Sequence, residues 1–101
     1  MTKSYLGRTK EVIIDDEKIT IGTYTHSTQL KISDLTNEGK VGESIDLFLV
    51  NTIKSWTLVD EAGVIFPITA ETLASLSGPF VDKITKECVA FNGLNPSEVK
   101  N

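Results

Sequence analysis

Two short runs of β-branched residues around an acidic segment constrain the fold of this chain most strongly. Val12–Ile14 and Ile19–Ile21 flank the sequence Asp-Asp-Glu-Lys at positions 15–18. Such runs around a short polar loop predict a β-hairpin, although this loop is not one of the tight Asn-Gly or Asp-Gly turns. Because an isolated hairpin is marginally stable in water, the predicted hairpin of residues 10–24 must pack against the rest of the chain.

The length of the chain allows one hydrophobic core. The 101 residues are expected to form a single domain (1–101), with an ordinary globular composition of 40% hydrophobic and 24% charged residues. Apolar runs such as Leu47–Val50 are far shorter than the roughly 20 residues that cross a bilayer. The N-terminus has no apolar stretch of the kind found in a signal peptide, and Cys88 is the single cysteine. We therefore expect a cytoplasmic protein that does not enter a membrane and has no internal disulfide.

The charge distribution argues against nucleic-acid binding. Residues 42–101 carry eight acidic and four basic residues, which accounts for the whole net charge of −4. No two basic residues are adjacent anywhere in the chain. A protein that binds nucleic acid needs clustered lysine or arginine to neutralise phosphates, so we expect no DNA or RNA partner.

Residues 43–56 show the strongest helical pattern. The apolar residues that share one stripe of a 3.6-residue period are Ile45, Phe48, Leu49, Ile53 and Trp56. Leu47 and Val50 lie outside this stripe. A helix that is apolar on more than one side is either enclosed in the core or offers a face to a partner, so Leu47 and Val50 are candidate partner-binding residues.

The segments on either side of this helix are less uniform. In residues 22–35, alternating Leu30 and Ile32 favour a strand, but the spacing of Leu30 and Leu35 is equally compatible with a short helix, so the secondary structure stays undecided. Residues 57–68 are predicted to form a turn or mini-hairpin around Gly63, which can adopt a positive φ angle.

Two helices are predicted within residues 70–92. Thr69 fits an N-cap, with Ile68 and Leu73 spaced for a hydrophobic staple, and Pro79 suits the first position of the second helix. Asn92-Gly93 is a helix C-terminus signal, and residues 94–101 are expected to form a flexible tail. Strands precede helices, so the predicted fold class is α+β: an N-terminal β-hairpin or small antiparallel sheet followed by a helical C-terminal half.

No catalytic, metal-binding or cofactor-binding motif is present in the sequence. His26, the single histidine, has no cysteine at metal-ligand spacing, and Cys88 lies on the apolar stripe of a predicted helix. We therefore expect a protein that is not an enzyme and has no cofactor. Trp56 is either a packing residue between the helix and the turn or an anchor in an interface, since tryptophan is enriched at binding hot spots. Phe80 and Phe91 are the further candidate partner-binding residues, as apolar side chains on a predicted helix.

The second half of the chain resembles the tail assembly chaperones of long-tailed bacteriophages and prophages. The resemblance covers about residues 43–101 and lies in the order and spacing of short motifs. These motifs are Ser55-Trp56, Asp60-Glu61-Ala62-Gly63, Pro67-Ile68-Thr69, Leu73–Leu76, Phe80–Phe91 and Pro96–Asn101.

The resemblance implies a non-enzymatic role. Proteins of this family bind the tape measure protein, keep its apolar helices soluble and recruit tail tube subunits while the tail is built. They are usually absent from the finished virion, and in many phages a programmed frameshift adds a C-terminal extension. The alternative in the same class is a structural subunit, such as a tail completion or connector protein, that stays in the virion. The sequence leaves open the oligomeric state, including a homo-oligomer, and the helix face that binds the client.

Overall fold

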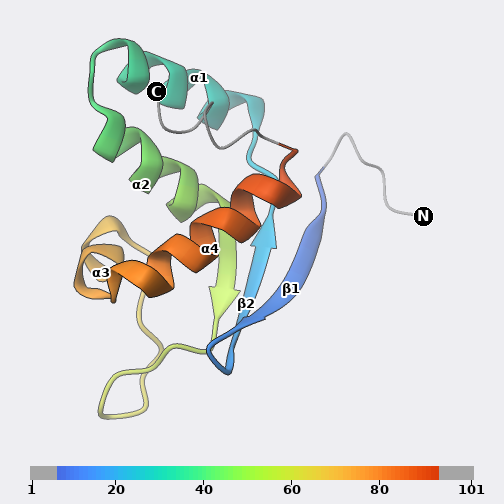
Figure 1. Ribbon diagram of the computed structural model, residues 1–101, viewed down its shortest axis with the longest axis vertical. Helices are drawn as coiled ribbons and strands as arrows, with labels where there is room; N and C mark the ends of the chain where they lie inside the picture. The colour runs from blue at the N-terminus through green and yellow to red at the C-terminus, as the bar shows by residue number, and fades with distance from the viewer. Residues whose placement is uncertain (1–6, 94–101) are drawn as a thin grey trace.

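The computed structural model describes residues 7–93, which form an α+β fold (Figure 1) and confirm the predicted fold class. The N-terminal hairpin comes first, the remaining strand follows the second helix, and two helices end the described chain. The elements in chain order are β1 (Thr9–Ile14), β2 (Glu17–Gly22), α1 (His26–Asn37), α2 (Val41–Thr52), β3 (Ile53–Trp56), α3 (Ala70–Ser75) and α4 (Gly78–Phe91).

The hairpin turn is tighter than the sequence predicted. β1 and β2 pair in antiparallel register up to Ile14 opposite Glu17, which leaves Asp15 and Asp16 as a two-residue turn. Both residues have positive φ angles, 50° and 69°. A two-residue turn with two positive φ angles matches the twist of a hairpin, and aspartate tolerates this region better than most residues. The expected four-residue loop is therefore wrong, because Glu17 and Lys18 already belong to β2.

The helix predicted over residues 43–56 ends early. α2 stops at Thr52, and Ile53 begins β3, which pairs antiparallel with β2. The register shifts by one residue between Ile21 opposite Ile53 and Thr20 opposite Ser55, so one extra residue is accommodated in β3. A β-bulge of this kind lets both Ile53 and Trp56 face the core, although their spacing in the sequence imitates a helical stripe.

Most of α1 lies within residues 22–35, the segment whose secondary structure the sequence left undecided. α1 starts after Thr25, whose side chain accepts a hydrogen bond from the backbone N–H of Thr28 at 3.3 Å. Only Thr28 of this helix is buried. Its apolar residues do not mark one face, because Ile32 is partly buried against the core whereas Leu30 is 54% exposed, so the amphipathic pattern on which a sequence-based prediction depends is weak.

The second half of the chain follows the predicted elements closely. Val59 and Ile65 form an isolated antiparallel bridge across the turn that contains Gly63, whose φ is 81°. Thr69 caps α3 by accepting from the N–H of Thr72 at 3.2 Å, and the Ser77 side chain caps α4 just before Pro79. The predicted tail at residues 94–101 lies outside the described residues.

α4 lies across one face of the sheet, which has the order β1–β2–β3 (Figure 1). Lys83 forms an ion pair of 2.7 Å with Asp15, and Asn92 Nδ2 donates to the Gly22 carbonyl at 3.3 Å, so the helix is attached at both ends of β2. The buried apolar core between these layers consists of Val12, Ile14, Ile19, Ile21, Phe48, Leu49, Ile53, Trp56, Leu58, Leu73, Ile84, Cys88 and Val89. Among residues 7–93, no helix is both long enough and apolar enough to cross a membrane.

Candidate partner-binding groove

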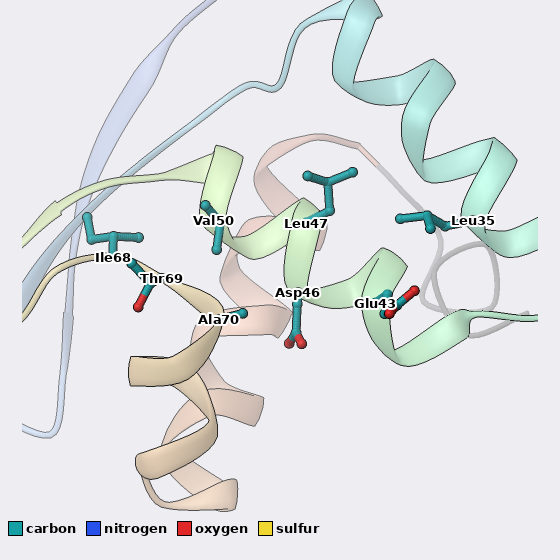
Figure 2. A pocket seen from close by; sticks show the side chains of 8 residues that line it. All are labelled: Leu35, Glu43, Asp46, Leu47, Val50, Ile68, Thr69 and Ala70. Atoms are coloured by element: carbon teal, nitrogen blue, oxygen red, sulfur yellow. The ribbon is translucent and has the colours of Figure 1, made fainter.

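An open groove lies between α1, α2 and the start of α3. Its volume is about 460 Å³, and its lining is mostly apolar. The lining residues are Leu35, Glu43, Asp46, Leu47, Val50, Ile68, Thr69 and Ala70. In the view of Figure 2, Ile68, Val50, Leu47 and Leu35 lie in a row, which we call the apolar row. Asp46 and Glu43, which we call the acidic pair, lie along one side of this row (Figure 2).

One face of α2 forms the floor of the groove. Glu43, Asp46, Leu47 and Val50 follow the spacing i, i+3, i+4 and i+7, which places them on a single side of a helix. Phe48 and Leu49, on the other side, are 2% and 1% exposed and enter the core. α2 therefore contributes to the core and to the groove at the same time, which explains why it is apolar on more than one side.

α1 provides one wall and is held against α2 at both ends. At one end, Thr28 Oγ1 donates to Asn51 Oδ1 at 3.3 Å. At the other end, the turn between the helices contains Gly39 with a φ of 80°, and the N–H of Lys40 donates to the Leu35 carbonyl at 2.8 Å. Leu35 itself is half-buried and lines the groove.

The chain between β3 and α3 provides the other wall. Trp56 Nε1 donates to the Phe66 carbonyl at 2.8 Å, and the Phe66 N–H donates to the Leu58 carbonyl at 3.0 Å. The Asp60 side chain stabilises the turn by accepting from the N–H groups of Ala62 and Val64 at 2.8 and 3.0 Å. These bonds fix the position at which the chain reaches Ile68, the groove residue just before the Thr69 cap.

The acidic pair gives the groove its charge. Within residues 7–93, the ion pairs are Lys40 with Glu38 at 3.5 Å and Lys83 with Asp15 at 2.7 Å. Neither carboxylate of the acidic pair has a cationic partner in this part of the chain. The border of the groove thus carries two negative charges beside an apolar surface.

The structure places the sequence-predicted partner-binding residues in three different environments. Leu47 and Val50 lie together in the groove. Trp56 is 4% exposed and is a packing residue of the core. Phe80 and Phe91 are partly buried against the core on α4, and the Arg8 guanidinium lies 5.2 Å from the centre of the Phe91 ring. Trp56, Phe80 and Phe91 do not line the groove.

Six groove residues were not singled out from the sequence as binding residues: Leu35, Glu43, Asp46, Ile68, Thr69 and Ala70. The acidic pair carried a usable signal, because it lies at helical spacing beside Leu47 and Val50. Leu35 and Ile68 carried none, since their positions depend on how α1 and the residues before α3 pack against α2.

The two side chains with the most reactive chemistry lie in different surroundings. His26 is exposed at the start of α1, with Nδ1 3.3 Å from Gln29 Oε1. Cys88 is fully buried. Burial raises the pKa of its thiol above the ordinary value of 9.0, a hydrogen bond with Thr52 partly opposes this, and the charge of Glu87 adds to the increase. In the described residues, no group of three His, Cys, Asp or Glu side chains is arranged to hold a metal ion.

A second apolar surface lies on the turn after β3, which projects from the body of the molecule (Figure 1). Val59, Val64 and Ile65 are 49%, 61% and 60% exposed. Asp60 and Glu61 are exposed in the same turn, and nothing in the described residues shows what would cover these side chains.

Comparison of the chain with family models, with curated proteins and with solved structures finds no match in any of the three.

Proposed function

We propose that this chain is a non-enzymatic tail assembly chaperone of a long-tailed bacteriophage or prophage. In this role it binds the tape measure protein and recruits tail tube subunits of the same phage in the host cytoplasm, and it is absent from the finished virion. The first support is the ordered series of motifs between Ser55 and Asn101 that resembles this family.

The observation that carries the proposal is the open groove with Leu47 and Val50 on its floor. A chaperone for a long helical client must present apolar side chains on its own surface while keeping a separate core. The division of α2 into a core side with Phe48 and Leu49 and a groove side with Leu47 and Val50 meets this requirement. Helix-in-groove contacts use apolar anchors at this spacing.

The small size of the groove suggests how the protein would cover a long client. A groove of about 460 Å³ accommodates only a few side chains of a partner. Many copies would therefore bind along one tape measure protein, each with a weak contact. Such contacts add up to firm overall binding when the sites are linked on one chain, yet each copy can leave as tube subunits replace it.

Deletion of the gene in the phage or prophage that encodes it tests this proposal. We expect heads without tails in electron micrographs, and tails restored by a plasmid copy. Mass spectrometry of the restored particles is expected to detect the tape measure protein and the tube protein but not this chain. Stoichiometric presence in purified particles would instead support a completion or connector subunit, and normal tails after deletion would refute both roles.

A further inference from the structure

We infer that the groove binds a single amphipathic α-helix of the client, with lysine or arginine residues along one border of its apolar stripe. The apolar stripe would lie on the apolar row, and the basic residues would face Glu43 and Asp46. The inference rests on the proposed function for the identity of the client, and on the groove itself for the chemistry of the helix.

The shape of the lining favours a stripe of apolar side chains. Ile68, Val50, Leu47 and Leu35 come from three separate parts of the fold and lie in one row across the groove (Figure 2). A helix presents apolar side chains in such a stripe when they recur at i, i+3, i+4 and i+7. Small ligands, by contrast, bind in clefts that enclose most of their surface, whereas this groove is open to solvent.

The surrounding backbone favours a helix over an extended segment. The groove is built by two helices and by residues 68–70, so it offers no free strand edge to which an extended peptide could add. An extended peptide would leave unpaired those backbone N–H and C=O groups that it buries against the apolar lining. A helix satisfies these groups internally and can therefore present apolar side chains to the groove at no such cost.

The acidic pair specifies the charge of the occupant. Both carboxylates lie on the same side of the apolar row and lack a cationic partner within residues 7–93. A basic border on the incoming helix would pair with them, and an acidic border would be repelled. A second copy of this chain is a poor occupant for the same reason, since its net charge is −4.

Two designed peptides test the chemistry of the occupant on the full-length chain. Both are helices of about 20 residues with the same leucine stripe, one with lysines along one border and the other with glutamates at the same positions. Binding is followed by fluorescence anisotropy at low and high salt. We expect saturable binding of the lysine peptide at low salt and weaker binding at high salt, with at least about tenfold weaker binding of the glutamate peptide.

Matched charge reversals locate the binding surface. The double variant Glu43→Lys and Asp46→Lys should weaken binding of the lysine peptide by about tenfold or more. The control variant Glu61→Lys and Asp82→Lys makes the same change in net charge at exposed positions outside the groove, and it should bind like the wild type. Circular dichroism verifies that both variants are folded. The double variant Leu47→Ala and Val50→Ala should weaken binding of the lysine peptide and should not strengthen binding of the glutamate peptide.

Several outcomes would overturn the inference. Failure of both peptides to bind the full-length chain would mean that the groove is closed by the chain itself or takes another kind of partner. Equal binding of the two peptides would refute the role of the acidic pair. A dimer that becomes monomeric in the Leu47→Ala and Val50→Ala variant would make the groove a contact between two copies.

Complementation separates this inference from the proposed function. If the Glu43→Lys and Asp46→Lys variant restores tails to the deletion mutant as well as the wild type does, the groove inference is wrong and the chaperone role stands. If deletion leaves tails intact, the chaperone role is wrong, and the two peptides alone decide whether the groove binds a basic amphipathic helix.

Discussion

Replacing Trp56 by phenylalanine should destabilise the chain and loosen one wall of the groove. The tryptophan is 4% exposed, and its Nε1 donates to the Phe66 carbonyl at 2.8 Å. The lost hydrogen bond costs about 0.5–1.5 kcal/mol, and the acceptor left behind adds to this if water cannot reach it. The smaller ring leaves a cavity of roughly 40 Å³, which adds about 1 kcal/mol. The free energy of unfolding should therefore fall by about 2–4 kcal/mol.

Urea unfolding followed by far-UV circular dichroism measures this loss without relying on tryptophan fluorescence. The melting temperature should fall by roughly 8–30 °C, given about 4–8 °C per kcal/mol for a domain of this size. The exposed neighbour Ser55→Ala is the control and should change stability by less than about 0.5 kcal/mol. Amide exchange should increase most at residues 64–69, which the Trp56–Phe66 bond holds in place. A loss below about 0.5 kcal/mol for Trp56→Phe would refute the packing role.

Three further predictions concern the turn, the cysteine and a helix cap. Asp16→Gly should raise the free energy of unfolding in urea by about 0.5–1 kcal/mol, because glycine adopts the φ of 69° without strain; a decrease would contradict the turn geometry. Because burial raises the pKa of Cys88, only the unfolded state loses the thiol proton above about pH 9, so stability should fall more between about pH 8 and 10 in the wild type than in Cys88→Ala; parallel pH curves would contradict this. Thr69→Ala removes the α3 cap and should cost about 1 kcal/mol in the same urea assay; unchanged stability would show that the cap is dispensable.

Elements whose signals are local were predictable from the sequence. The β-branched runs around Asp15-Asp16 predict the hairpin, and the Thr69 cap with Pro79 predicts two helices in the correct places. In each case, the residues that determine the structure lie within one turn of each other. The α+β class follows from the order of these elements.

Elements that depend on distant partners were not predictable. The spacing of Ile53 and Trp56 continues the helical stripe of α2, and only pairing with β2 and its bulge makes this segment a strand. α1 has a single buried residue, Thr28, which hydrogen-bonds to Asn51 on α2, while its apolar residues range from the partly buried Ile32 to Leu30 at 54% exposed. Neither interaction leaves a periodic signal in the sequence.

Only part of the groove could be predicted, because some of its residues come together only through contacts between distant segments. Leu47 and Val50 were identified because they fall outside the buried stripe of their own helix. Leu35 and Ile68 complete the apolar row only after α1 and the turn that follows β3 have packed beside α2. For Trp56 the sequence left open a packing role between helix and turn or an interface anchor, and the structure shows a 4% exposed side chain whose indole N–H donates to the Phe66 carbonyl.

The amount of tape measure protein that stays soluble on co-expression is the measurement that addresses the chaperone role most directly. The tape measure protein of the same phage is expressed in three ways: alone, together with this chain, or together with the Leu47→Ala and Val50→Ala variant. We expect it to be largely insoluble alone, to become soluble and co-purify with the wild-type chain, and to lose most of this rescue with the variant. A tape measure protein that stays insoluble with the wild-type chain, or that is equally soluble without it, would contradict the chaperone role.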